Sequence, residues 1–470
     1  MATLVMKFGG TSVGSPEAMD RAARLVARYR ETWPNLVVVT SALAGVTDAL
    51  LRAAREAVAG DMEAVRQIRR RLEDRHRAVV EALLPQGTQD PVWFLIQNRL
   101  DTFFRLAEAM AVLGEATPRG LDAIAATGER MSAPLLARVL EVRGVPAVAV
   151  DAAQIIVTDD QHQAAHPLEE PTRARIQERL KPLLAQGQVP VVTGFVGATE
   201  KGVTTTLGRG GSDYSASLIA AWLPADEVWI WTDVNGVMTA DPRLVPEART
   251  VPQLSYREVA ELAYFGAKVL HPKTIRPVVE AGIPLRVRNT FDPDGPDTLI
   301  VRERKHAVPG RIMALTTIPR LAMVIVEGRG MLGVPGVAAR TFAAVAATDT
   351  SVLMISQASS EQSICFVIPE DTVKGVVQAL EDTFQRELAR RDIDRIWAME
   401  KVAIVTAVGE GLRNTPGVAG RIFGALGQAG VNIIAIAQGA SEVGLSMVVA
   451  QDAAQRALQA LHPLTQGDAV

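Results

Sequence analysis

The segment KFGGTSVGSPEAM (Lys7–Met19) joins a short apolar run, Leu4–Met6, to a helical pattern, after only six residues of chain. Its paired glycines let the backbone approach a ligand closely, and a helix N-terminus offers free N–H groups to an anion. The lysine adds a positive charge. The segment therefore predicts a phosphate-binding loop after the first strand. In the common P-loop the lysine follows the glycines, so this loop is of another kind.

The composition is that of a globular protein with two or three domains, because the chain has 470 residues, of which 48% are hydrophobic and 21% charged. A net charge of −3 gives no electrostatic case for nucleic acid or an acidic membrane. The single cysteine, Cys365, excludes an intramolecular disulfide and fits a reducing compartment. We find neither a signal peptide nor an apolar run long enough to span a bilayer, and expect a cytoplasmic protein without nucleic-acid or membrane partners.

Short apolar runs alternate with helical patterns over residues 1–300. Among these runs are "NLVVVTSALAG", "VPAVAVDAAQ", "VPVVTGFVG" and "DEVWIWTDVNGV". Continuous Val, Ile and Ala runs of this kind indicate parallel strands that are covered on both faces. The pattern predicts an α/β domain over residues 1–300, with three αβα layers and a mainly parallel sheet.

An internal repeat follows. "GVPGVAARTFAAVAATDTSVLMISQASSEQSICFVI" aligns without a gap to "NTPGVAGRIFGALGQAGVNIIAIAQGASEVGLSMVV". Gln357 and Gln438 take the same place in the two copies. Each copy reads as a βαββαβ unit, but the second ends without a last strand. We expect residues 311–318 to supply that strand, which gives domains at 319–400 and at 311–318 plus 401–470.

Cationic residues recur beside glycine loops. "TLGRGGSDYSASLIAA" (Thr206–Ala221) opens a second helix and carries Arg209, which suits bidentate binding of a carboxylate or phosphate. Asp213 in this loop would hold cationic side chains or coordinate a metal. "YFGAKVLHPKT" contributes Lys268. We expect Lys7, Arg209 and Lys268 to converge at the carboxyl ends of the parallel strands, where ligands of such sheets bind. Several cations suit phosphoryl transfer.

Glu129, in "TGERMSAPL", opens a predicted helix. A carboxylate is a poor neighbour for ATP and a good partner for the ammonium group of an amino acid. A glutamate in a first helical turn can equally serve the helix dipole. From these residues alone both interpretations stay open.

The motifs "KFGGTSV", "TGERMSAPL", "GRGGSDYSA", "TDVNGVMTADPR" and "FGAKVLHP" resemble, in order and spacing, those of aspartate kinases in the amino-acid-kinase superfamily. The resemblance covers the whole chain, and the duplicated unit is similar to paired ACT domains. It implies an amino-acid-kinase domain followed by two ferredoxin-like ACT domains. It also implies that ATP phosphorylates L-aspartate to 4-phospho-L-aspartate, the step that opens the route to lysine, threonine and methionine.

The resemblance further implies roles for single residues. Lys7 and Lys268 would stabilise the transferring phosphoryl group, and Asp213 would orient them. Arg209 and Glu129 would hold the α-carboxylate and α-ammonium of aspartate. The residues that would complete the substrate pocket are Ser41 and Thr47.

A second set of residues would contact the nucleotide by the same resemblance. These residues are Gly9, Gly10, Thr232, Asp233, Gly236, Met238, Arg243 and Lys268. We expect no dedicated metal ligands, because Mg²⁺ commonly binds through substrate phosphates; the cofactor is therefore ATP with Mg²⁺.

The turns "ISQASSEQSICF" and "IAQGASE" resemble the kinase half of bifunctional aspartokinase–homoserine dehydrogenases, although the chain ends at Val470 and we expect no dehydrogenase domain. The resemblance implies an amino-acid effector near Gln357 and Gln438, threonine in preference to lysine, and a homodimer or higher homo-oligomer through the ACT domains. A glutamine at a turn can also merely bridge backbone groups.

Two other functions compete with this one. Glutamate 5-kinase or acetylglutamate kinase activity would use the same fold, but the paired repeats and the Glu129 motif argue against it. A catalytically inactive amino-acid sensor would need only the repeats. The intact Lys7, Arg209, Asp213 and Lys268 argue against that alternative.

Overall fold

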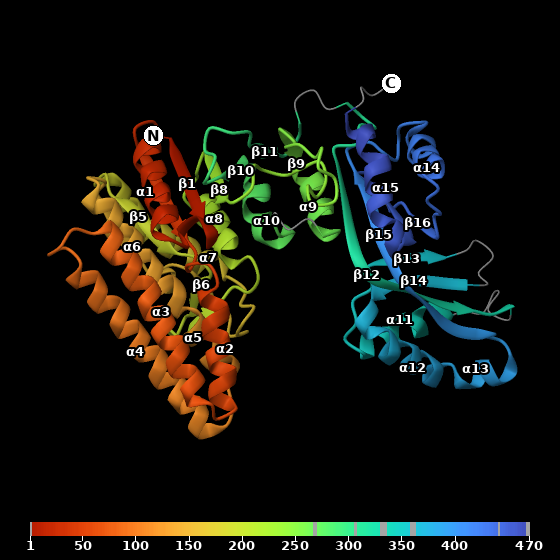
Figure 1. Ribbon diagram of the computed structural model, residues 1–470, viewed down its shortest axis with the longest axis horizontal. Helices are drawn as coiled ribbons and strands as arrows, with labels where there is room; N and C mark the ends of the chain where they lie inside the picture. Colours follow the sequence, from red (N-terminus) through yellow and green to blue (C-terminus); the bar gives the residue numbers. More distant parts are fainter. Residues whose placement is uncertain are drawn as a thin grey trace. The chain divides into compact units, whose positions relative to one another are not determined.

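The computed structural model describes residues 2–266, 270–304, 308–329, 336–357, 363–439 and 442–466. The chain forms two compact units (Figure 1). The first comprises Met1–Val237, Pro252–Tyr256 and Val269–Arg302, and the second comprises Met238–Val251, Arg257–Lys268 and Glu303–Val470. Segments 238–251 and 257–268 of the predicted domain 1–300 thus belong to the second unit. The predicted domain boundaries stay a prediction.

The first unit is built on an eight-stranded sheet, and this confirms the predicted α/β fold with a mainly parallel sheet. Each pair from β3 to β10 runs parallel, whereas β10 and β11 run antiparallel. The strands, in sheet order, are β3 (Ala147–Val150), β5 (Val189–Thr193), β2 (Asn35–Thr40), β1 (Thr3–Phe8), β8 (Glu227–Thr232), β10 (Leu285–Asn289), β11 (Thr298–Val301) and β9 (Gln253–Ser255).

Helices cover both faces of this sheet, which is why its central strands are buried and mostly apolar. Every residue of β1 is buried, and Leu4, Met6 and Phe8 alternate onto one face, where they pack with the helices that follow β1 and β2. The helices on that side are α1 (Pro16–Arg30), α2 (Val46–Val58), α3 (Met62–Leu83), α4 (Asp90–Leu113) and α6 (Thr127–Val142). Those on the other side are α7 (Glu169–Ala185), α8 (Gly211–Trp222) and α10 (Pro272–Ala281).

A small three-stranded sheet lies between β5 and α8 in the chain. Its central strand β6 (Val196–Thr199) pairs in parallel with β4 (Val157–Thr158) and antiparallel with β7 (Thr204–Thr206). The end of β7 packs against the short helix α5 (Pro118–Ala125). This contact joins segments that are far apart in the sequence.

The second unit holds one six-stranded antiparallel sheet. Its strands, in sheet order, are β13 (Met354–Gln357), β14 (Ser363–Pro369), β12 (Ala314–Glu327), β15 (Arg395–Val408), β17 (Gly444–Ala450) and β16 (Ala435–Ala437). Its helices are α9 (Tyr256–Tyr264), α11 (Val337–Ala347), α12 (Val373–Thr383), α13 (Gln385–Arg390), α14 (Val418–Gln428) and α15 (Ala454–Leu461). The first residue of α9, Tyr256, is assigned to the first unit.

The two repeats share their longest strands, β12 and β15. Leu321–Glu327 of β12 pairs with β14 of the first repeat, whereas Ala314–Ile318 pairs with Ile404–Val408 in the second. The residues at the two changeover points are Arg320 and Lys401, and both adopt left-handed backbone angles, with φ of 58° and 57°. Each repeat thus obtains a complete βαββαβ unit, because β12 and β15 each run on from one repeat into the other.

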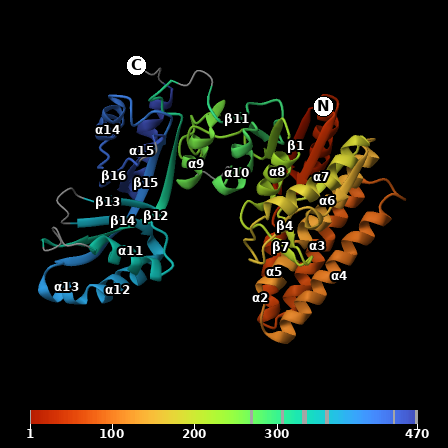
Figure 2. The same ribbon diagram turned by 180° about the vertical axis from the view of Figure 1, so that it is seen from behind.

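Helices pack on one face of this shared sheet (Figure 2). Val324 and Phe366 lie under α11 and α12, and Val405 and Met447 lie under α14 and α15. The opposite face carries a separate apolar cluster, to which Met323 belongs. None of the helices in the described ranges has both the length and the apolar composition of a membrane span.

Because Lys401 adopts a left-handed backbone angle, we expect a substitution to glycine at this position to stabilise the protein instead of destabilising it. A side chain costs about 1–2 kcal/mol in this conformation, whereas glycine adds about 0.5–1 kcal/mol of chain entropy loss. We therefore expect Lys401→Gly to raise the free energy of unfolding by about 0.5 kcal/mol, measured by urea denaturation of the second unit's transition.

The control is Gln378→Gly, at an exposed interior position of helix α12. It should lower the free energy of unfolding by about 1 kcal/mol. Equal losses from the two substitutions would contradict the stated reason for the junction.

Candidate active site

A buried ion pair stands at the carboxyl end of the central strand. Lys7, in β1, extends its Nζ to 2.6 Å from Oδ1 of Asp213, in the first turn of α8, and the two side chains are only 11% and 15% exposed. A buried ammonium is stable when a carboxylate lies this close. The pair fastens the two predicted glycine loops, one after β1 and one before α8, to each other.

The loop after β1 runs close to the loop after β2. A Cβ atom on Gly10 would lie 3.0 Å from the carbonyl oxygen of Ala42 and 3.2 Å from the Cα atom of Ala44. Ala44 also donates its N–H to the carbonyl of Gly10. Glycine is therefore required at this position, because the backbones of the two loops approach each other closely. The same approach brings Ser41, at the start of the second loop, next to the first loop.

The loop before α8 carries Arg209. The next residue, Gly210, has a φ of 72°, and a Cβ atom there would lie 2.9 Å from Cγ2 of Thr274. Arg209 itself is exposed and makes no hydrogen bond or ion pair with any described residue. Its guanidinium group is thus available for a carboxylate or phosphate.

Glu129 is a carboxylate enclosed almost completely, with 3% of its surface exposed. Its Oε1 accepts a hydrogen bond of 3.1 Å from the N–H of Ala42, while no partner is found for Oε2 within the described ranges. Burial raises the pKa of Glu129 to about 7, although this hydrogen bond and the charges of Arg130 and Lys7 oppose the rise. A cationic ligand at Oε2 would remove the cost of that burial.

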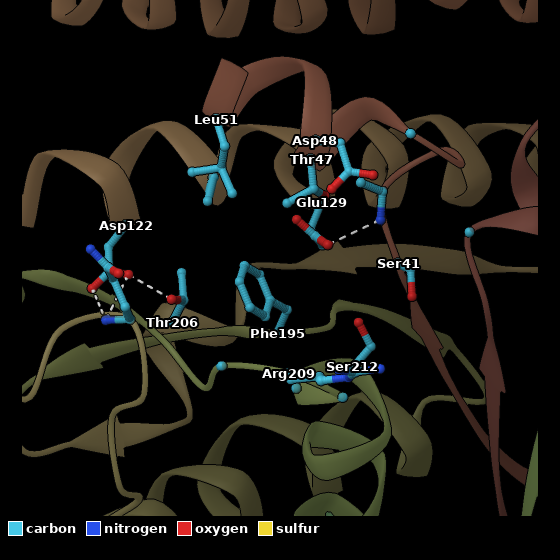
Figure 3. Close-up of a pocket in the computed structure, with 18 of the residues that line it drawn as sticks. Ser41, Thr47, Asp48, Leu51, Asp122, Glu129, Phe195, Thr206, Arg209 and Ser212 are labelled. Carbon is cyan, nitrogen blue, oxygen red and sulfur yellow. Dashed lines mark hydrogen bonds between the residues drawn. The ribbon is translucent and has the colours of Figure 1, made fainter. Parts of the chain in front are cut away.

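These groups surround one cavity of about 690 Å³ (Figure 3). Of the predicted substrate and catalytic residues, the cavity brings together Lys7, Ser41, Thr47, Glu129, Arg209 and Asp213. It contains charges of both signs, as an amino acid with a second carboxylate requires. Their roles remain predictions.

Sequence reasoning missed several residues that line the cavity. They include Asp48, Leu51, Asp122, Gln163, Phe195 and Ser212. Phe195 and Gln163 adopt left-handed backbone angles, with φ of 67° and 71°, and such strain is common beside ligand sites. Ser212 could have been found from the sequence because it adjoins the "GRGG" loop. Asp122 had no local signal.

Of the predicted nucleotide residues, Gly10 lines the cavity, whereas the other described ones do not. Thr232 is the last residue of β8 in the first unit, and Asp233 and Gly236 follow the strand. Met238 and Arg243 belong to the second unit, where Met238 bridges to Thr250 and Arg243 pairs with Asp241 at 2.6 Å.

Three further predicted residues have other placements. Lys268 lies outside the described residues. Gln357 ends β13 and Gln438 follows β16, and both side chains are exposed.

The described part of the chain contains no group of three His, Cys, Asp or Glu side chains arranged to hold a metal ion. That a divalent ion arrives with the nucleotide stays a prediction.

Family models match both parts of the chain. Residues 2–289 match the amino acid kinase family, and residues 324–384 and 405–463 match the ACT domain.

Similar proteins cover nearly all of the chain. The bifunctional aspartokinase/homoserine dehydrogenase 1, chloroplastic, of Arabidopsis thaliana is 37% identical over 466 residues, which are 97% of this chain and 50% of that protein. The chain therefore spans about half the length of such relatives. Aspartokinase 1, chloroplastic, of the same plant is 34% identical over 475 residues, covering 98% of this chain and 79% of its own length.

Solved structures of E. coli aspartokinase III are similar too. The complex with aspartate and ADP, in the R-state, has a TM-score of 0.81 at 31% identity and covers 99% of this chain and 100% of its own. The complex with lysine and aspartate, in the T-state, has a TM-score of 0.78 at 33% identity, with 98% and 99% covered.

The raised pKa of Glu129 predicts a dependence of stability on pH. The folded protein holds this proton up to about pH 7, whereas an unfolded chain loses it near pH 4.3. Between these values the folded state binds more protons, so the ligand-free protein loses stability as pH rises. We expect the stability gain from Glu129→Gln to grow from under about 1 kcal/mol near pH 5 to about 3 kcal/mol near pH 8, measured by denaturant unfolding.

Glu108→Gln is the matched control, since Glu108 is an exposed glutamate on helix α4. Its effect on stability should stay within about 0.5 kcal/mol at both pH values. A gain from Glu129→Gln that does not change with pH would contradict the burial argument.

Proposed function

The chain belongs to the amino acid kinase family and, within it, to the aspartokinases, and we propose that it transfers the γ-phosphoryl group of ATP to the β-carboxylate of L-aspartate. The products are 4-phospho-L-aspartate and ADP. The observation that carries the proposal is the cavity in which the buried carboxylate of Glu129 shares the walls with Lys7 and Arg209. The binding of aspartate and ADP by E. coli aspartokinase III supports it.

Aspartate would bind through both of its α-substituents. Its ammonium group pairs with Glu129, whose Oε2 has no described partner, and its α-carboxylate pairs with Arg209. Ser41 and Thr47, which line the same cavity, complete the polar contacts. The β-carboxylate is then left to react.

The reaction needs no general base, because a β-carboxylate is already ionised near neutral pH. Catalysis would rest on alignment of the attacking oxygen and on neutralisation of charge on the phosphoryl group. Lys7 supplies this charge beside Gly9 and Gly10, and Asp213 holds its ammonium in place at 2.6 Å. Lys268 is proposed as a second cation.

The nucleotide contacts are proposed from the family motif. Mg²⁺ carried by the phosphates of ATP would add positive charge. The residues proposed to contact the nucleotide are Gly9, Gly10, Thr232, Asp233, Gly236, Met238, Arg243 and Lys268. We propose the cytoplasm as the place of action, on the basis of the single cysteine of the chain.

Lys7 gives the most direct test of the chemistry. Lys7→Ala should lower kcat for aspartate-dependent ADP release by at least about 10²-fold, because one preorganised charge is lost, while the KM for ATP should change much less. Lys201→Ala, at an exposed lysine, serves as the control. Near-normal kcat in Lys7→Ala would remove this lysine from the mechanism.

The same assay with glutamate and N-acetylglutamate tests the substrate. Aspartate should give the highest kcat/KM of the three. A higher value for either alternative acceptor would contradict the aspartate kinase assignment.

We also propose that an amino acid regulates the enzyme at the ACT repeats. The turns that hold Gln357 and Gln438 resemble those of bifunctional aspartokinase–homoserine dehydrogenases, and this resemblance favours threonine. The T-state structure of E. coli aspartokinase III holds lysine, so threonine is proposed first and lysine second. Gln357 and Gln438 would contact the effector, since an amide can both donate and accept hydrogen bonds. The effector would act within a homodimer or higher homo-oligomer formed through the ACT repeats.

Gln357→Ala and Gln438→Ala should weaken inhibition by threonine and leave the uninhibited kcat almost unchanged. Coupling of this kind is typically worth about 1–3 kcal/mol, or about 5- to 150-fold in affinity. Gln378→Ala, an exposed glutamine of helix α12, is the control. If calorimetry detects no binding of threonine, lysine or methionine to the wild type, the regulatory proposal fails while the kinase proposal stands.

A further inference from the structure

Asp122 is a buried carboxylate that the proposed chemistry does not use. Only 1% of its surface is exposed, and three donors converge on it. The hydroxyl group of Thr206 is one of them (Figure 3). Its Oδ1 accepts hydrogen bonds from Oγ1 of Thr206 at 2.5 Å and from the N–H of Gln163 at 3.0 Å. Its Oδ2 lies 2.6 Å from Nδ1 of His162, which can bond a carboxylate only as a donor.

The donors lie on two segments at the cavity wall. Gln163 and Thr206 both line the cavity, as Asp122 does. The same two segments are joined by a hydrogen bond of 3.0 Å from the N–H of Ala165 to the carbonyl oxygen of Thr206. Gln163 holds a left-handed angle, with a φ of 71°, and such a conformation persists only where its surroundings hold it. The bond from its N–H to Asp122 does so.

The chain passes from Thr206 to Arg209 in three residues. Between them Gly208 has a φ of 74°, and a Cβ atom there would lie 3.0 Å from the carbonyl oxygen of Gln163. The segment that carries Arg209 therefore runs directly against the Gln163 turn. A shift of that turn would move the point from which the arginine extends.

We propose that Asp122 is a positioning residue for the substrate: it fastens the Gln163 turn to Thr206 and so fixes the base of Arg209 where the guanidinium meets the α-carboxylate of aspartate. This inference rests on the proposed function. Arg209 has no hydrogen-bond or ion-pair partner among the described residues, so its place depends on its backbone. A buried charged hub is a poor device for stability alone, because well-packed apolar residues often serve at least as well.

Thr206→Val tests this proposal, because it keeps the side-chain shape and removes the hydroxyl group that binds Asp122. The KM for aspartate should rise about tenfold, while kcat and the KM for ATP stay within about twofold, as expected when ground-state binding is lost. Thr206→Ser keeps the hydroxyl group and should restore the KM for aspartate.

Thr205→Val is the matched control on the same strand. Thr205 is equally buried and loses a comparable hydrogen bond, of 2.7 Å to Oγ1 of Thr158, but it does not line the cavity. Both variants should lose thermal stability, but only Thr206→Val should change the KM for aspartate. The proposal is overturned if the two variants have the same KM for aspartate.

His162→Ala keeps the test decisive if Thr206→Val does not fold, since His162 is partly exposed and donates to the same carboxylate. It should raise the KM for aspartate and spare that for ATP; an unchanged KM for aspartate would overturn the proposal. A wild type that releases no ADP with aspartate contradicts the proposed function itself. An active wild type with an unaffected Thr206→Val contradicts only the role of Asp122.

Discussion

The ion pair between Lys7 and Asp213 is the constraint on which the arrangement of the candidate site depends. A lysine in a central, fully buried strand is stable only with a counter-charge beside it, and Asp213 supplies this at 2.6 Å. The pair fixes the first turn of α8 to the end of β1. The glycine loops that flank these elements are thereby held at one cavity, so the group that stabilises the fold also prepares the proposed chemistry.

Glu129 shows the opposite relation between stability and function. Its carboxylate is buried with one oxygen unpaired among the described residues, and its pKa is raised to about 7 by that burial. The ligand-free protein thus carries a cost that an ammonium group would relieve. Lys7 and Glu129 together divide the cavity into regions suited to groups of opposite charge. This division is what an amino-acid substrate with a reactive carboxylate requires.

The sequence predicts those features that have a local cause. Continuous runs of Val, Ile and Ala predict the parallel strands β2, β3, β5 and β8, and the short apolar run Leu4–Met6 predicts β1. The gapless duplication predicts two similar units. The features it does not predict depend on distant partners. Asp122 and Thr206 lie 84 positions apart, and the left-handed angles of Phe195 and Lys401 have no glycine to announce them. The surrounding fold holds these residues in the left-handed conformation, so the conformation cannot be predicted from the neighbouring sequence alone.

Trapping of the acyl phosphate tests the central claim most directly. Hydroxylamine converts an acyl phosphate to a hydroxamate, so the wild type, incubated with ATP, Mg²⁺, L-aspartate and hydroxylamine, should yield aspartate β-hydroxamate, identified by mass spectrometry. The product should require both ATP and an intact Lys7. Release of ADP without any hydroxamate, or formation of the α-isomer, would contradict phosphorylation of the β-carboxylate in this cavity.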